Sequence, residues 1–272
     1  MKRYIFLIFA PLFFISADSV GRPETSADDY VLIFSDEFNQ PNGSAPDKAV
    51  WSCPPRSNKG WNRWVKDIPE VAYIRKGKLV CRAIPNRAHP TDTAKMLTGA
   101  VFSRKKFEFR YGKIEVRMKT NLKVGNFTSA WLRTWESKEQ PLYSEIDIVG
   151  MMGNLPRSLH TVHSELTTKN PKHGTKNHFA IDCNVKKWHV YGVIWTPENI
   201  VWTLDGKKVG EYRKSKDPQL LSKGQWSFDY PLFIVLNQSV GSGGYDHFMP
   251  QYNDIYETQF DWVRVYQKRG SR

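Results

Sequence analysis

The stretch Ser144-Glu145-Ile146-Asp147-Ile148-Val149-Gly150 sets the fold prediction, because apolar and acidic residues alternate in it. Successive side chains of a β-strand point to opposite faces, so Glu145 and Asp147 share one face while Ile146 and Ile148 share the other. We therefore expect a half-buried strand with two carboxylates on its wet face. Carboxylates this close repel each other when both are charged, which raises the pKa of at least one of them. An ordinary strand with an acidic wet face is an equally good interpretation of this stretch alone.

Short β-rich runs recur along the rest of the chain between turn signals, which predicts an all-β, antiparallel sandwich or barrel. Ile114, Val116 and Met118 alternate with charged residues, as expected of a strand with one wet face. An Asp205-Gly206 pair between two such runs predicts a tight hairpin. The other strand-like runs cover residues 73–82 (broken at Lys76-Gly77), 190–196, 200–204, 231–237 and 262–266.

The N-terminal residues resemble an export signal rather than part of the domain. Basic residues precede the apolar run 5–15 and small residues follow it, while the run is shorter than the ~20 residues that span a bilayer. We expect a signal peptide at 1–18, a short polar linker at 19–29 and a single β-sandwich domain at 30–268. The protein should then be exported, and be periplasmic, cell-surface-associated or secreted. No membrane span is expected.

The chain is strongly basic, with a formal net charge of +13, which would attract acidic partners such as sulfated or uronic glycans. The positive residues are scattered and form no recognised nucleic-acid module, so we expect no nucleic-acid partner. A basic surface that is merely solvated is the alternative. Three cysteines, Cys53, Cys81 and Cys183, permit at most one internal disulfide, and the sequence does not pair them.

A series of further blocks follows in a fixed order around the acidic strand: Phe34-Ser35-Asp36-Glu37-Phe38, Trp61-Asn62-Arg63, Tyr111-Gly112-Lys113-Ile114-Glu115-Val116-Arg117, Ser129-Ala130-Trp131-Leu132, Glu145-Ile146-Asp147-Ile148, His189-Val190-Tyr191-Gly192-Val193-Ile194-Trp195-Thr196, Leu204-Asp205-Gly206, Val235-Leu236-Asn237 and Asp261-Trp262-Val263-Arg264-Val265-Tyr266. Together they resemble the family 16 glycoside hydrolases, the laminarinases, lichenases and related galactan hydrolases. The resemblance implies a concanavalin A-like jelly-roll β-sandwich with a concave glycan-binding cleft. It also implies a β-linked polysaccharide as partner, β-1,3-glucan or a related glycan.

The resemblance assigns catalytic roles within the acidic strand. In the retaining mechanism one carboxylate attacks the anomeric carbon and a second carboxylic acid, about 5 to 5.5 Å away, protonates the leaving oxygen. Glu145 matches the family's nucleophile and Asp147 its helper carboxylate. The family's acid/base Glu stands two or three residues after that Asp, where this chain has Val149 and Gly150. Gly150 has the wrong parity to share the face of Glu145 unless the strand bulges by one residue, and it carries no proton donor.

The resemblance also assigns substrate-binding residues. Trp131 resembles the tryptophan beside the reacting sugar, where a ring face can take the apolar side of a pyranose. Trp61, Asn62 and Arg63 resemble a substrate-side stretch, and the loop 237–245 resembles one at the cleft rim. For all of these, a core aromatic or a surface hydrogen bond is the alternative. His163 resembles a residue that faces the cleft and hydrogen-bonds substrate.

Two functions of different classes follow from these residues. The first is a glycan-binding protein on a glycosidase scaffold, with retaining endo-hydrolysis impaired or lost because the acid is missing at Gly150. The second is an active retaining endo-β-glycanase that uses a substitute general acid such as His163. We predict no metal in the site and no cofactor, although the family often carries a structural calcium whose ligands the sequence does not identify. We expect a monomer.

Overall fold

The computed structural model describes residues 29–135, 142–170, 172, 174–241 and 249–270. The predicted export signal at 1–18 and nearly all of the predicted linker at 19–29 lie outside these residues. Residues 242–245 of the predicted rim loop at 237–245 also lie outside them.

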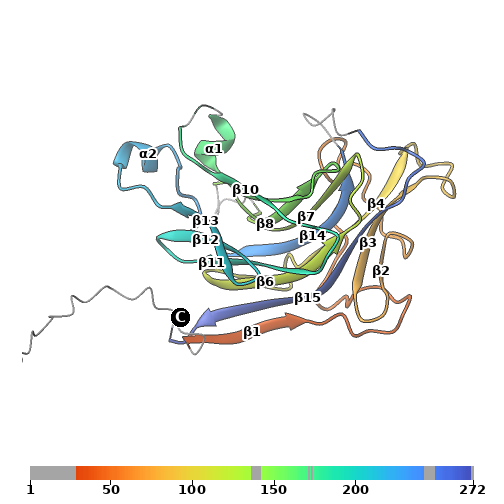
Figure 1. Ribbon diagram of the computed structural model, residues 1–272, viewed down its shortest axis with the longest axis horizontal. Coiled ribbons are helices and arrows are strands. Elements are labelled where there is room, and N and C mark those ends of the chain that lie inside the picture. Colours follow the sequence, from red (N-terminus) through yellow and green to blue (C-terminus); the bar gives the residue numbers. More distant parts are fainter. Residues whose placement is uncertain (1–28, 136–141, 171, 173, 242–248, 271–272) are drawn as a thin grey trace, which may run out of the picture.

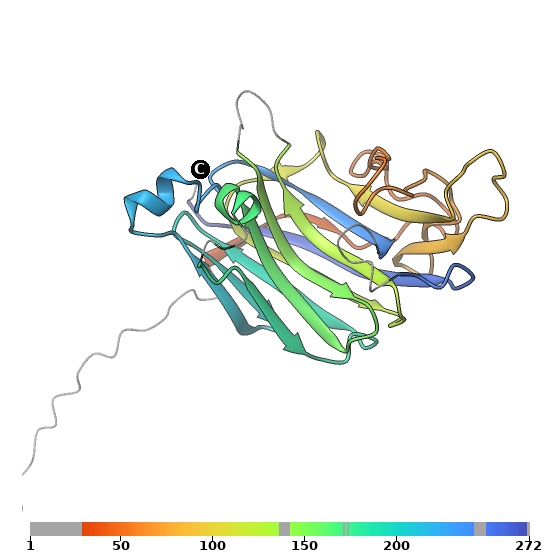
Figure 2. The same cartoon turned by 90° about the horizontal axis from the view of Figure 1, so that it is seen from above.

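The described residues form the predicted all-β fold, a continuous 15-stranded sheet that folds over itself into two layers (Figure 1). The sheet order in the front layer is β10 (His178–Asp182), β9 (Arg157–Ser164), β8 (Ser144–Met152), β7 (Asn126–Arg133), β14 (Leu232–Val240) and β4 (Met96–Phe102). The back layer continues from β4 with β3 (Leu79–Pro85), β15 (Tyr256–Lys268), β6 (Gly112–Thr120), β11 (His189–Trp195), β12 (Asn199–Leu204) and β13 (Lys207–Arg213). Three strands lie off this path: β1 (Tyr30–Asp36) pairs with β15, β2 (Ala72–Ile74) with β3, and β5 (Glu108–Phe109) with β14. Seen from above, the green strands β7 to β9 lie side by side (Figure 2).

The core lies between the two layers and is built from the alternating apolar residues of both. In β6 the residues Ile114, Val116 and Met118 are buried while their charged neighbours are half-exposed, as predicted. Ile146 and Ile148 of β8 are likewise fully buried. Burial of such side chains, at roughly 25 cal/mol per Å² of apolar area, is the main stabilising contribution to this fold.

The predicted hairpin is confirmed by the antiparallel pairing of β12 with β13 around Asp205 and Gly206. Both residues have positive φ, 49° and 78° respectively, as a two-residue turn of this kind requires. A second turn, at Lys76 and Gly77, separates β2 from β3 in the same left-handed conformation.

In the described part of the chain two short helices connect strands, α1 (Glu165–Lys169) after β9 and α2 (Pro218–Ser222) after β13. No helix in the described ranges has the length and apolar character needed to cross a membrane. Cys53, Cys81 and Cys183 are all free thiols, so no pair among them forms the disulfide that the sequence left open.

Candidate active site

A cleft of about 580 Å³ lies on the outer face of the front layer, over β7, β8 and β9. Its described lining combines aromatic, polar and acidic side chains: Trp61, Phe127, Ser129, Trp131, Tyr143, Glu145, Asp147, Gly150, Met152, Leu159, Thr161, His163, Thr168, Asn177, His178 and Asn237. Apolar ring faces beside a few converging polar groups are typical of a ligand-binding site.

A bulge in β8 decides which of its side chains reach this cleft. Asp147 pairs with Trp131 of β7, but the next pair along is Val149 with Ala130, so Ile148 is an extra residue. The extra residue reverses the parity of the strand. Glu145, Asp147 and Gly150 therefore all line the cleft, while Val149 is buried in the core.

The backbone carbonyls at the bulge are held by two buried side chains. The indole Nε1 of Trp202, in the back layer, donates to the carbonyl oxygen of Asp147 at 2.8 Å. Nδ1 of His160 lies 2.7 Å from the carbonyl oxygen of Ile148, and since a carbonyl only accepts, Nδ1 carries the proton. Nε2 of His160 then accepts from the Ser158 hydroxyl at 3.0 Å. Burial lowers the pKa of His160, which is consistent with a neutral ring.

Glu145 and Asp147 both lie close to His163 on β9. Nε2 of His163 lies 3.4 Å from Oδ2 of Asp147 and 3.6 Å from Oε1 of Glu145. On its other side, Oε2 of Glu145 accepts a hydrogen bond from the Tyr143 hydroxyl. The two carboxylates are mostly shielded, with side chains 15% and 19% exposed, whereas His163 is 39% exposed.

The protonation of this group follows from its surroundings. Burial and the negative charge of Asp147 raise the pKa of Glu145 to about 7, although His163 and Tyr143 act in the opposite direction. Burial alone would lower the pKa of His163, but its hydrogen bond to Asp147 and the two negative charges outweigh this and raise it to about 9. At neutral pH His163 is therefore an imidazolium that balances the acidic pair.

Glu145, Asp147 and His163 also form the only group of metal-ligating side chains within the described ranges that could hold an ion together. Their candidate ligand atoms lie within 4.8 Å of one another. The contacts of His163 with both carboxylates are already those of a charge-assisted pair, so the arrangement is explained without a metal.

Among the described residues that line the cleft, Glu145 and Asp147 are the only carboxylic acids. Gly150 lies on the same face and contributes no side chain. A Cβ placed on Gly150 would meet only Ser129 Oγ, at 3.5 Å, which is an ordinary contact. Glu165 stands two residues after His163 and would share its face if the strand continued. Instead it begins α1, forms an ion pair with Lys169 and is not part of the cleft lining.

The predicted binding residues divide into two groups. Trp131 lines the cleft and donates from Nε1 to Oδ1 of Asn237 at 2.9 Å. It is 4% exposed, because it packs in a buried cluster with Phe102, Phe233 and Val235 and the Trp61 ring lies against it in a T-shaped contact. Trp61 itself is half-buried and lines the cleft, so its ring is the more accessible of the two. Asn62 and Arg63 are not part of the lining. Asn62 hydrogen-bonds within its own loop, and Arg63 donates to the Gly241 carbonyl and lies over the Trp64 ring.

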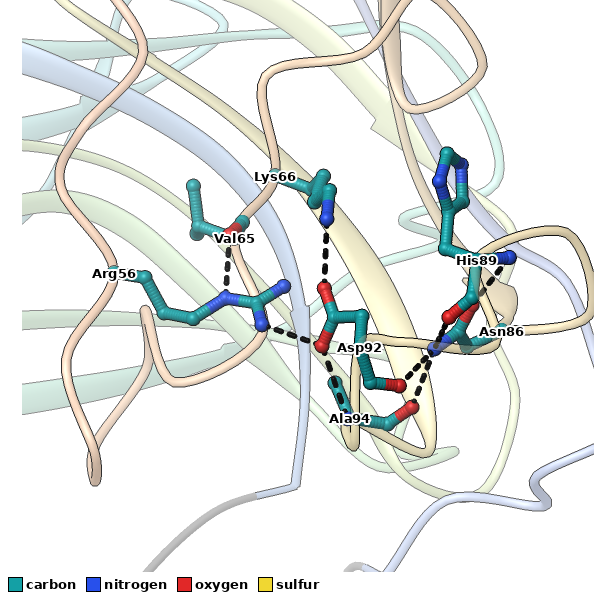
Figure 3. A network of polar contacts seen from close by, with 7 residues as sticks. All are labelled: Arg56, Val65, Lys66, Asn86, His89, Asp92 and Ala94. Carbon is teal, nitrogen blue, oxygen red and sulfur yellow. Dashed lines mark hydrogen bonds and ion pairs between the residues drawn. The ribbon is translucent and has the colours of Figure 1, made fainter.

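The loop that carries Trp61 is anchored by Asp92 (Figure 3). The Asp92 carboxylate accepts from Arg56 at 2.7 Å and from Lys66 at 2.9 Å, and both cations belong to the Trp61 loop. Arg56 also donates through Nε to the carbonyl of Val65 at 2.9 Å. The hydrogen bonds from these two cations hold the pKa of Asp92 well below its usual range. Trp61 is thus positioned by ion pairs that lie outside the cleft.

The comparison with known families agrees with this geometry. The sequence model described as "Glycosyl hydrolases family 16" matches residues 82–236, more than half of the 272-residue chain. The chain belongs to glycosyl hydrolase family 16.

Several known proteins resemble this one over most of its length. A keratan-sulfate endo-1,4-β-galactosidase from Sphingobacterium multivorum is 30% identical over 244 residues, covering 88% of this chain and 55% of that protein. A β-glucanase from Rhodothermus marinus is 27% identical over 285 residues, covering 98% of this chain and 94% of that protein. The solved structure of SCLam, a non-specific endo-β-1,3(4)-glucanase, matches with a TM-score of 0.76 and 25% identity, covering 91% of this chain and 95% of that one. The chain therefore spans about half of the galactosidase and nearly all of the β-glucanase.

Sequence reasoning missed several residues of this family 16 cleft. Tyr143 stands two residues before Glu145, and Thr161 two before His163, so the two-residue period of a strand could have placed both on the cleft face. Asn177 and His178 come from the edge strand region beyond β9, and Thr168 from α1. No local pattern marks these three, because they reach the cleft through the path of the chain.

Proposed function

We propose that this family 16 protein binds a β-linked polysaccharide in the cleft and that its retaining endo-hydrolysis is impaired or lost. The single observation that carries the proposal is Gly150. It occupies the cleft position to which the bulge brings the third residue after Asp147. Apart from Glu145 and Asp147, the described lining offers no carboxylic acid that could protonate a leaving group. General acid catalysis contributes roughly 10² to 10⁴ in rate.

The cleft favours an uncharged sugar at the reacting position. Its described lining contains two acids, the imidazolium of His163 that balances them, and no Lys or Arg. β-1,3-Glucan is our first candidate, in keeping with the glucanases among the relatives. A β-linked galactan is the second, because one relative is a keratan-sulfate endo-1,4-β-galactosidase.

Binding is tested by a screen across laminarin, lichenan, agarose, porphyran, carrageenan and keratan sulfate. Trp61→Ala should weaken binding of whichever glycan enters the cleft, because it removes the accessible ring face. Trp262→Ala, the same change on the outer side of the back layer, is the matched control and should leave binding of an uncharged glycan such as laminarin unchanged. Equal losses in both variants would contradict binding in the cleft.

The chemistry is tested with a β-glycoside that carries an activated aryl leaving group. Glu145 can attack its anomeric carbon and expel the aryl oxide without a proton, leaving a glycosyl ester on Glu145. Azide, which needs no general base, can then attack the same carbon, release the Glu145 carboxylate and yield a glycosyl azide. We expect aryl glycoside plus azide to be turned over much faster than polysaccharide. Comparable, appreciable rates on both without azide would show that an acid is present.

A substitute acid is the second candidate, and His163 is the residue for it. It lines the cleft and its raised pKa keeps it protonated at neutral pH. Against this role, Nε2 already faces Asp147 and Glu145, and a group with a pKa of about 9 gives up its proton reluctantly. If His163 is the acid, His163→Gln abolishes polysaccharide hydrolysis while the aryl glycoside reaction continues.

Export and a monomeric state also belong to the proposal. The basic start, the apolar run 5–15 and the small residues after it support cleavage near residue 18. The N-terminal sequence of the protein recovered from its native host would test the cleavage, and sedimentation would test the monomer. An intact Met1 in that protein would contradict export through this signal.

A further inference from the structure

A second groove, of about 670 Å³, lies on the outer side of the back layer and is strongly basic. Its floor includes Lys119 of β6 and Gln259 of β15, which are cross-strand partners. Its described lining carries four cations, Arg82, Lys119, Lys123 and Lys186, against the single acid Glu257. We propose that this groove is a second binding site, separate from the cleft, for an anionic polysaccharide.

The cations of the groove are only partly neutralised by the protein. Within the part of the chain that the structure describes, Lys119 and Lys186 have no ion pair; Lys119 lies 4.8 Å from the centre of the Trp188 ring, and Lys186 is exposed. Glu257 is shared between Arg82 and Arg75. At least two positive charges therefore remain for a ligand.

The positive surface continues from the groove onto the neighbouring strand positions. Trp188 is surrounded by Lys119, Arg117 and Lys78, whose charged groups lie 4.8, 5.0 and 5.8 Å from its ring centre. Asp261 alone pairs with both Lys78 and Arg117. The result is an extended strip of cations rather than a point, which suits a polymer with repeated negative charges.

The composition of the groove favours a glycan over other polyanions. Single-stranded nucleic-acid sites combine cations with open aromatic faces on which bases stack. The groove lining contains no aromatic residue among the described positions, and Trp188 beside it is already covered by cations. Gln259 and Asn121 supply amide groups that can hydrogen-bond sugar hydroxyls. Ile255 in the lining and Val124 beside it are the exposed large apolar residues here, and two such side chains are too few for insertion into a membrane.

The cleft and the back groove differ in the charge of the residues that line them. The cleft lining has no Lys or Arg, whereas the back groove has an excess of them. The groove would hold sulfate or carboxylate groups of a polysaccharide while the cleft on the opposite layer takes an uncharged sugar. This inference goes beyond the proposed function and does not depend on catalysis.

The test measures binding of dextran sulfate, polygalacturonate and neutral dextran to the full chain and to Lys119→Gln/Lys186→Gln. Lys216→Gln/Lys223→Gln is the charge-matched control, since both of these exposed lysines flank α2 at the other end of the back layer (Figure 1). We expect the groove variant to bind the anionic glycans at least ~5-fold more weakly and with a shallower salt dependence. The control variant should bind as the parent does, and neutral dextran should not bind. Lys186→Gln alone, at an exposed position, gives the same readout if the change at Lys119 disturbs folding.

Two results would overturn the proposal. Equal weakening in the groove and control variants would show a diffuse basic surface without a site. Stronger binding of a single-stranded DNA oligonucleotide or of phosphatidylserine vesicles than of either anionic glycan would assign the surface to another partner. Binding of neutral laminarin in the cleft is measured separately, with Trp61→Ala, so a failure there leaves this test unaffected.

Discussion

Replacing Gly150 with glutamate would add a carboxyl group to the cleft with little disturbance of the strand. The backbone of Gly150 is not in the left-handed region, and an added Cβ meets Ser129 Oγ at 3.5 Å and nothing closer. The bulge that turns this position toward the cleft is already held from behind by Trp202 and His160. The new side chain would therefore extend from the same strand face as Glu145 and Asp147.

The expected gain can be worked out from the site. A third carboxyl beside Glu145 and Asp147 experiences their negative charge, which raises its pKa and keeps it protonated as a general acid requires. Proton donation to the leaving oxygen is worth about 10² to 10⁴ in rate, or ~3 to 5 kcal/mol of barrier. We predict that Gly150→Glu increases hydrolysis of the polysaccharide that binds in the cleft by at least ~10²-fold. The aryl glycoside reaction should gain much less, because its leaving group needs no proton.

The assay compares release of reducing ends from that polysaccharide by the parent, Gly150→Glu and Gly150→Gln. Glutamine has nearly the same shape but no acidic proton, so it separates chemistry from packing. A second control, Gly150→Glu with Glu145→Gln, should be inactive because the nucleophile is gone. If Gly150→Glu melts like the parent, binds the glycan and still hydrolyses it no faster than Gly150→Gln does, the assignment of this position is wrong.

Three further predictions follow from the ionisation and hydrogen bonding of the site. The kcat/KM for an aryl glycoside should rise as pH passes about 7, where Glu145 becomes ionised. His163→Gln should move this rise to higher pH, because it removes the positive charge beside Glu145. An unshifted profile would contradict the contact between His163 and Glu145. Asp92→Asn should cost about 1 kcal/mol of stability and weaken glycan binding through Trp61. Because the pKa of Asp92 is depressed on folding, its contribution is present above its ordinary pKa and is lost as pH falls through the folded value, so urea unfolding should show a smaller acid-dependent loss in the variant. Trp202→Phe should lower the free energy of unfolding in urea by about 1 to 3 kcal/mol, since the buried Asp147 carbonyl at the bulge loses its hydrogen-bond donor. An unchanged midpoint would mean that water replaces the indole.

Local periodicity was enough to predict the regular parts of the fold. The alternation in β6 and β8 depends only on which side chains face the core, and the turn at Asp205 and Gly206 depends on two residues that tolerate positive φ. The one-residue bulge needed to bring Gly150 to the cleft face is present between Asp147 and Gly150. The alternation and the turn follow from sterics within a few residues of chain, whereas the bulge is also held by Trp202 and His160.

The parts of the site that could not be predicted depend on contacts distant in sequence. The anchor of the Trp61 loop is an aspartate 36 residues after Arg56 and 26 after Lys66, and no spacing rule connects them. The hydrogen bond from Trp202 to the Asp147 carbonyl spans 55 residues and crosses from one layer to the other. Asn62 and Arg63 illustrate the converse, because adjacency to Trp61 in sequence did not place them in the cleft lining.

The bulge in β8 serves the core as much as the cleft. Without it, Val149 would face the cleft and Gly150 would face the core, leaving a hole where a branched side chain now packs fully buried. The shape of the strand is therefore maintained by Val149, Trp202 and His160, whatever residue occupies position 150. In the function proposed above, leaving-group protonation depends instead on the side chain at position 150. Because the two requirements fall on different residues, a glycan-binding cleft can keep its geometry while its hydrolytic step is switched by a single substitution.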